Sequence, residues 1–189
     1  MNIQNYQLNL MDKYKLSLLS LGDDLALKIL LCYTTTLHIY TMSYKGPFKP
    51  KNISKYKGDP SKIIYRSLWE LRFMRYLDTT PSVLKWSSEE VVIPYRSPID
   101  GRRHRYFPDF WIRVKTKDGT IKESLIEIKP KAQCSPPKGP PKDNRKRRRY
   151  IREVKTWGVN EAKWKAALAF CKDRKWSWKI LTEDDLTKY

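Results

Sequence analysis

A β-hairpin is the feature that most constrains how this chain folds. It is predicted over residues 108–131 (PDFWIRVKTKDGTIKESLIEIKPK). In its first strand, apolar residues alternate with other side chains, as in a half-buried strand; these apolar residues are Phe110, Ile112 and Val114. Asp118-Gly119 supplies a tight turn. The second strand, IKESLIEIK, runs back and ends at Pro130. The pattern predicts two adjacent strands of a larger sheet.

Three charged residues lie near one end of this hairpin. Asp109 stands early in the first strand, and Glu127 and Lys129 stand late in the second. Residues two apart on a strand face the same way, so Glu127 and Lys129 share a face while Ile126 and Ile128 point to the other. The turn then brings Asp109 near Glu127. Two adjacent carboxylates repel each other and favour a divalent cation such as Mg²⁺.

This set of groups suits hydrolysis of a phosphodiester. Asp109 and Glu127 are expected to hold Mg²⁺, with the main-chain carbonyl of Ile128 as a third oxygen ligand. Mg²⁺ would lower the pKa of a bound water, and Lys129 would position that water and stabilise the charged phosphate. Glu70 would complete the metal shell or act on the water. The predicted catalytic residues are therefore Glu70, Asp109, Glu127 and Lys129.

Glu70 lies in a helix predicted over residues 61–78, with Ser61 as its N-cap. At 3.6 residues per turn, Glu70 falls within an apolar stripe; its other members are Ile63, Ser67, Phe73, Met74 and Leu77. A lone buried carboxylate is costly unless it is paired or bound to a metal. A solvated glutamate on a mixed helix is the alternative explanation.

The charge of the chain predicts a polyanionic partner. The formal net charge is +19, from 39 Lys and Arg against 20 Asp and Glu. Nucleic acid is the first candidate and an anionic membrane surface the second. A basic helix begins near residue 144, and its arginines are expected to bind the phosphates of double-stranded DNA: Arg145, Arg147, Arg148, Arg149 and Arg152. A solvated helix face or a localisation signal is the alternative.

The remaining elements predict a small α/β domain with a mixed sheet flanked by helices. Two strands are expected in residues 83–96, and Arg102–Arg105 should lead directly into the next strand. The proline-rich stretch 130–143 should be a loop. A second C-terminal helix, capped by Asn160, should precede the final strand, WSWKIL.

Residues 1–42 differ in kind from the rest of the chain. Three lysines balance three aspartates there, so the whole net charge of +19 lies in residues 43–189. We expect residues 1–42 to be an N-terminal extension, with translation of the native protein starting at Met42; a short partner-binding helix is the alternative. Residues 43–62 are expected as a basic extended arm and residues 63–189 as the nuclease domain.

No apolar run approaches the ~18 residues needed to cross a bilayer, so no membrane partner is expected. The cysteines (Cys32, Cys134 and Cys171) lack metal-ligand spacing and indicate a reducing, intracellular setting.

The motif Glu70…Pro108-Asp109…Glu127-Ile128-Lys129 resembles the PD-(D/E)XK nuclease superfamily. Within it, YRSLWE, YFPDFWI and LIEIKPK resemble TnsA-type endonucleases, and more closely the head completion nucleases of tailed phages. The resemblance covers residues 43–189 and implies a restriction-endonuclease-like core. It also implies a Mg²⁺-dependent DNA endonuclease that processes packaged DNA ends before neck and tail attachment.

Portal or neck proteins would then be its partners, and the virion head or neck, with the host cytoplasm during assembly, its location. Two other functions remain open. One is a non-catalytic, basic DNA-binding structural protein at the capsid vertex. The other is a nucleic-acid-binding module unrelated to phages.

Overall fold

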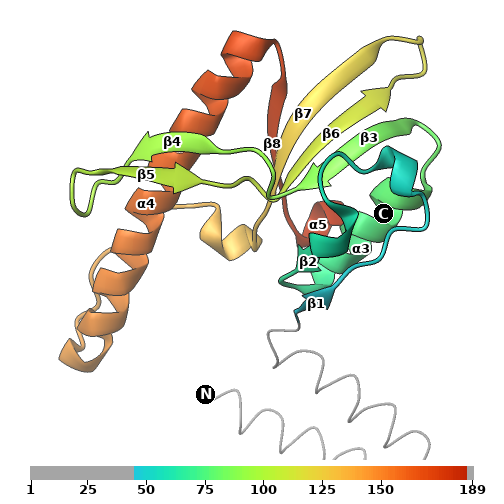
Figure 1. Cartoon of the computed structure of the whole chain (residues 1–189). Coiled ribbons are helices and arrows are strands. Elements are labelled where there is room, and N and C mark those ends of the chain that lie inside the picture. Colours follow the sequence, from blue (N-terminus) through green and yellow to red (C-terminus); the bar gives the residue numbers. More distant parts are fainter. Residues whose placement is uncertain (1–44, 187–189) are drawn as a thin grey trace, which may run out of the picture. The chain divides into compact units, whose positions relative to one another are not determined.

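The structure is a computed structural model that describes residues 45–186. The extension predicted over residues 1–42 lies outside the described residues. Lys45–Tyr189 form one compact unit, and Figure 1 shows its helices and strands.

A four-stranded sheet forms the centre of this unit. It consists of β3 (Val83–Ser88), β6 (Phe110–Lys115), β7 (Ile121–Ile128) and β8 (Ser177–Leu181), in the order β3-β6-β7-β8. β6 is antiparallel to both β3 and β7, whereas β7 and β8 are parallel. The predicted mixed sheet is therefore confirmed, and β6 and β7 form the predicted hairpin. Gly119 has a φ of +85° in the turn, a conformation that glycine adopts without steric cost.

The two faces of the sheet bury separate hydrophobic clusters. On one face, α3 (Leu68–Thr79) and α5 (Glu183–Leu186) pack on side chains that include Phe110, Ile126 and Ile128. On the other, α4 (Asn144–Arg174) packs on Trp111 and Leu125. Leu125 and Ile126 thus point to opposite faces, as the alternation in β7 predicts.

The segment before α3 packs against this domain. Its elements are β1 (Gly46–Pro47), β2 (Ile64–Tyr65) and two short 3₁₀ turns, Ile53–Lys55 and Pro60–Lys62. Phe48 and Tyr56 are buried, with ring centroids 5.8 and 4.8 Å from that of Trp86. The buried carboxylate of Asp78 accepts hydrogen bonds from the main-chain N–H groups of Lys51, at 2.8 Å, and Asn52. Residues 45–62, expected as an extended basic arm, therefore contribute to the core.

A second hairpin lies outside the central sheet. β4 (Ile93–Arg96) and β5 (Arg103–Tyr106) pair only with each other and lie across α4 (Figure 1). The prediction that residues 102–105 run straight into the next strand was wrong. Phe107-Pro108-Asp109 separates β5 from β6, because Pro108 has no N–H to donate to a sheet.

Two predicted helix boundaries were also wrong. α3 begins after Ser67 rather than Ser61, because the Ser67 hydroxyl accepts the N–H of Glu70 and caps the helix there. α4 is one helix of 31 residues, and Asn160 is buried within it rather than at its start. Gly158 lies inside this helix, where an added Cβ would come 3.6 Å from Pro98. None of the helices in residues 45–186 is long and apolar enough to cross a membrane.

Candidate active site

Asp109, Glu127 and Lys129 meet where β6 begins and β7 ends. The Ile128 N–H donates to Asp109 Oδ2 at 2.6 Å, which ties the start of one strand to the end of the other. Lys129 Nζ donates to Glu127 Oε1 at 3.0 Å. The Glu127 side chain is only 7% exposed, so this ion pair is largely shielded from solvent. The hairpin therefore brings together the three groups that the sequence singled out.

The environment of Asp109 disfavours its charged form. Burial raises the pKa of Asp109 well above its ordinary value, and the negative charges of Glu127 and Glu70 raise it further. The hydrogen bond from Ile128 and the charge of Lys129 act in the opposite direction but do not cancel this effect. Protein atoms surround the carboxylate on most sides, although Asp109 keeps some exposed surface. A strongly perturbed carboxyl beside a charge partner is a feature of functional sites.

Glu70 approaches this site from the first turn of α3. One of its carboxylate oxygens accepts the Arg66 N–H at 2.7 Å, and the other accepts the Ser67 hydroxyl at 2.9 Å. Together with the bond from the Glu70 N–H to Ser67, this is a variant of the capping box in which the carboxylate accepts the N–H of the residue before the N-cap. Burial raises the pKa of Glu70. Glu70 therefore has a structural role at the helix start, and its predicted role in the metal shell stays a prediction.

A neutral substitution distinguishes these two roles of Glu70. Glutamine also serves in a capping box, so Glu70→Gln should leave the thermal unfolding midpoint close to that of wild type. If the charge of Glu70 contributes to catalysis, cleavage of duplex DNA should fall roughly 100-fold, within the range of such electrostatic contributions. Glu153→Gln, in the exposed part of α4, is the control. If Glu70→Gln cleaves DNA at the wild-type rate, Glu70 caps the helix and has no catalytic role.

Sequence reasoning missed two contributors to the site. Tyr106 is buried at the end of β5, and its hydroxyl donates to Glu127 Oε2 at 2.6 Å. Lys129 and Tyr106 thus fix both oxygens of Glu127. No spacing rule indicates this, because the pair joins the β4–β5 hairpin to the central sheet.

The second missed contributor is Glu89, which follows β3 with a φ of +54°. Its main-chain N–H donates to the Asp109 carbonyl at 3.2 Å, and its carboxylate holds Arg66 through two bonds of 2.8 Å. A non-glycine residue with positive φ is uncommon and costs free energy, so it is often found near a functional site. The dipeptide Glu89-Glu90 after a strand offered no signal of this conformation.

The charges around the site leave room for a divalent cation. Four carboxylates interact here, those of Glu70, Glu89, Asp109 and Glu127, against two cations, Arg66 and Lys129. With all four ionised, the imbalance is two negative charges, which agrees with the raised pKa of Asp109. Asp109 and Glu127 are the carboxylates at the strand ends, and Asp109 Oδ1 accepts no hydrogen bond from residues 45–186. This donor set fits a hard cation such as Mg²⁺, although no three His, Cys, Asp or Glu side chains of residues 45–186 cluster as a metal site by themselves.

The arginines predicted to bind DNA lie away from these carboxylates. They occupy the N-terminal half of α4, which extends past the sheet (Figure 1). All five are exposed; they are Arg145, Arg147, Arg148, Arg149 and Arg152. Arg149 pairs with Glu153 at 2.8 Å, an exposed i,i+4 pair. Contact between these arginines and DNA stays a prediction.

Comparison of the chain with known proteins identifies its family. Residues 80–183 match the family described as "TnsA-like endonuclease N terminal", and this segment contains Asp109, Glu127 and Lys129. The chain is also 46% identical over 146 residues to the head completion nuclease of Enterobacteria phage T4. That alignment covers 77% of this chain and 95% of the phage T4 protein.

The chain belongs to the TnsA-like endonuclease family. The resemblance inferred from the motifs, and the enzyme class that it implied, are therefore confirmed. The mixed α/β architecture agrees with the restriction-endonuclease-like core expected of such an endonuclease. Glu70 lies outside the segment that matches the TnsA-like endonuclease family.

Proposed function

We propose that this endonuclease cleaves double-stranded DNA with the help of Mg²⁺ held by Asp109, Glu127 and the main-chain carbonyl of Ile128. The observation that carries the proposal is the junction of β6 and β7. There, two carboxylates face one ammonium group, and burial together with repulsion from Glu127 raises the pKa of Asp109. A bound divalent cation would relieve that repulsion. When bound, it would also supply Lewis acidity and a water of lowered pKa.

The side chains of the protein divide the remaining work. Tyr106 and Lys129 hold Glu127 in one orientation through bonds of 2.6 and 3.0 Å. The Ile128 N–H holds one oxygen of Asp109, so the other is free to face a ligand. Lys129 is 23% exposed, which leaves its ammonium able to reach a phosphate at the protein surface. There it would offset negative charge that develops during hydrolysis.

We further propose that the enzyme acts in head completion of a tailed phage and processes packaged DNA ends before neck and tail attachment. The relative from phage T4 is named for head completion, and its alignment includes 95% of that protein. The proposal places the enzyme in the virion head or neck and in the host cytoplasm during assembly. Portal or neck proteins are its proposed partners.

A cleavage assay tests the proposed chemistry. The full chain is incubated with linear or circular duplex DNA of one sequence, in Mg²⁺ or in EDTA. We expect cleavage in Mg²⁺ and none in EDTA, because without the cation the site lacks both the Lewis acid and the water of lowered pKa. Cutting of the circular form identifies an endonuclease, and end-labelled linear DNA reveals trimming at ends. Equal cleavage in EDTA would contradict the metal-dependent mechanism.

The alternative function gives a different result in the same assay. A basic structural protein of the capsid vertex would bind both DNA forms in Mg²⁺ and in EDTA but would cut neither. The net charge of +19 is compatible with this function, whereas the clustered carboxylates favour catalysis. Phage particles assembled with a Glu127→Gln protein test the biological role. Normal maturation of their heads would show that head completion does not require cleavage by this protein.

A further inference from the structure

The β4–β5 hairpin has one face turned away from α4, and that face is basic. Cα pairs across the two strands are Pro94 with Arg105 and Arg96 with Arg103. Directly opposed residues of an antiparallel pair lie on the same face, as do alternate residues of a strand. These four side chains therefore share one face, and all four are exposed. Residues of the other face, Ile93 and Tyr106, pack in the cluster beneath α4.

The three arginines of this face have no acidic partner in the part of the chain that the structure describes. Within residues 45–186, no carboxylate forms an ion pair with Arg96, Arg103 or Arg105. Elsewhere in the domain, Arg66 and Arg113 each pair with a glutamate at 2.8 Å. Like charges placed directly opposite each other across a strand pair are unfavourable. An anion bound on this face would relieve that repulsion.

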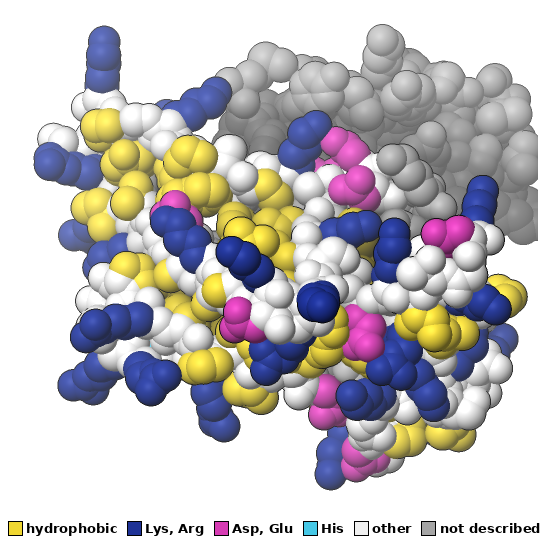
Figure 2. Space-filling model, turned by 90° about the horizontal axis from the view of Figure 1, so that it is seen from above, with side chains coloured by type: hydrophobic (Ala, Val, Ile, Leu, Met, Phe, Trp, Pro, Cys, Tyr) yellow, Lys and Arg dark blue, Asp and Glu magenta, His cyan; other side chains and the backbone are white. Residues whose placement is uncertain are grey.

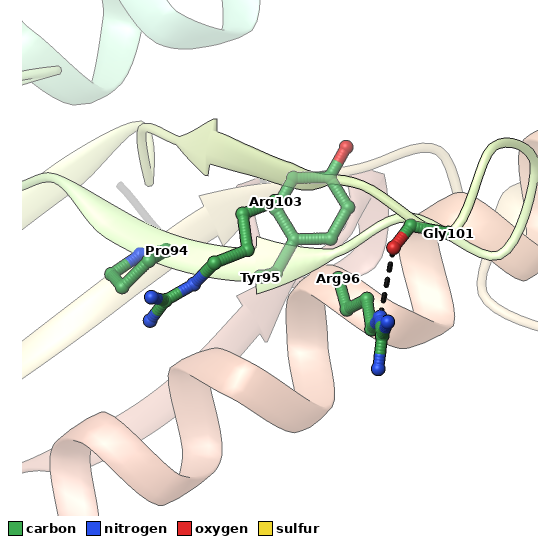
Figure 3. A pocket seen from close by; sticks show the side chains of 5 residues that line it. All are labelled: Pro94, Tyr95, Arg96, Gly101 and Arg103. Carbon is green, nitrogen blue, oxygen red and sulfur yellow. Dashed lines mark hydrogen bonds between the residues drawn. The ribbon is translucent and has the colours of Figure 1, made fainter.

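A hollow in the hairpin surface lies between two of these arginines. Its volume is about 500 Å³, and Figure 3 shows its lining: Pro94, Tyr95, Arg96, Gly101 and Arg103. Arg96 Nε donates to the Gly101 carbonyl at 2.8 Å, which fixes one guanidinium group at the rim. Guanidinium groups have the fork geometry that phosphate oxygens match. No carboxylate lines this hollow.

The hairpin is joined directly to the catalytic strands. Arg105 is followed by Tyr106, whose hydroxyl holds Glu127, and Asp109 stands only a few residues further along. Figure 2 shows dark-blue side chains interspersed with yellow ones in the left part of that view, where Figure 1 places the hairpin and α4. The arginine face is therefore separated by only a few residues of chain from Asp109.

We infer that the outer face of the β4–β5 hairpin, through Arg96, Arg103 and Arg105, binds the phosphate backbone of duplex DNA next to the site of cleavage. The inference rests on the proposed DNA-cleaving function and adds a second contact surface to the arginines of α4. Phosphate contacts position DNA without reading its sequence. The hairpin would therefore fix where the duplex lies rather than which sequence is cut.

The test measures binding in EDTA, so that it does not depend on catalysis. Fluorescence anisotropy of a labelled blunt duplex gives log K against log [KCl] for the wild-type chain. The variant Arg96→Gln/Arg103→Gln/Arg105→Gln should lose up to about 2.7 from the slope, since each phosphate contact contributes about 0.9 on duplex DNA. The control Lys115→Gln/Lys117→Gln/Lys122→Gln removes the same charge near the turn of the β6–β7 hairpin. It should keep the wild-type slope.

Two further variants separate binding from folding. Arg103→Gln/Arg105→Gln preserves the bond from Arg96 to Gly101 and should lose up to about 1.8 from the slope. Replacement of all three arginines by lysine retains the charge and should restore most of it. Two results would overturn the inference. One is an unchanged slope in Arg103→Gln/Arg105→Gln, and the other is an equal loss of slope in the control Lys115→Gln/Lys117→Gln/Lys122→Gln. If the arginine variants show these losses of slope but the wild-type chain never cleaves DNA in Mg²⁺, the proposed function fails and the binding surface stands.

Discussion

Asp109→Asn is expected to lose roughly 1,000-fold in the rate of duplex cleavage, at the upper end of losses for a single charge-stabilising group. Asparagine keeps the shape and can still accept the Ile128 N–H. It removes the negative charge that the proposed cation at the strand ends would require. Single-turnover cleavage of labelled duplex at saturating Mg²⁺ measures the loss.

The same substitution should stabilise the metal-free protein at neutral pH. The Asp109 carboxyl has a folded-state pKa well above its ordinary value of 3.8, so the folded chain binds its proton more tightly than the unfolded chain does. The free energy of unfolding therefore falls as the pH rises from about the ordinary pKa through the raised one. Asp109→Asn has no proton to lose at this position, so its free energy of unfolding should not show this decrease with pH. Thermal unfolding in EDTA at several pH values measures it, at about 2–4 °C per kcal/mol for a chain of this size.

Asp118→Asn is the matched control for Asp109. Asp118 lies in the turn of the same hairpin, where bonds from Thr116 and Thr120 lower its pKa to about 2. Its replacement should leave cleavage unchanged and should not raise the melting temperature at neutral pH. Wild-type cleavage by Asp109→Asn would exclude Asp109 as a catalytic residue.

Lys129→Met should reduce the rate of cleavage roughly 100- to 1,000-fold with little change in duplex affinity. Methionine keeps most of the unbranched stem and removes the ammonium that pairs with Glu127 at 3.0 Å. Because that ion pair is mostly shielded, the variant should also lose stability, on the order of 1–3 kcal/mol. Urea unfolding measures the second effect separately from the first.

Lys131→Met is the control for this experiment. Lys131 stands two residues further along, is 69% exposed and pairs with Asp184 at 2.7 Å. An exposed pair of this kind contributes little to stability, so cleavage and unfolding should both match wild type. If the two variants lose activity equally, the ammonium of Lys129 has no special role. Arginine at position 129 would not replace it well, because its planar fork does not fit a site built for a compact ammonium.

The sequence was sufficient to predict the central hairpin and its charged end. Alternation in β6 and β7 and the turn at Asp118-Gly119 predicted both strands, and the spacing of two between Glu127 and Lys129 put them on one face. Helix boundaries were less accessible. Ser61 and Ser67 are both plausible caps, and only packing of residues 45–65 against the sheet selects the second. The merging of two predicted helices into α4 likewise depends on contacts with the rest of the domain.

Contacts between distant elements could not be predicted. The bond from Tyr106 to Glu127 joins two separate sheets, and the left-handed backbone of Glu89 has no local signal such as glycine. The fine structure of the site therefore depends on tertiary packing. The motif predicts the chemistry, whereas the residues that orient it become visible only in three dimensions.

The position of β7 inside the sheet, with β6 on one side and β8 on the other, has a consequence for motion. Inner strands exchange their amide protons slowly, since they open only when much of the domain unfolds. The β4–β5 hairpin pairs with neither neighbour, but the bond from Tyr106 to Glu127 ties it to β7. Glu127 thus lies on an inner strand while Tyr106 links it to the hairpin proposed to bind DNA, so a movement of that hairpin would be transmitted to Glu127.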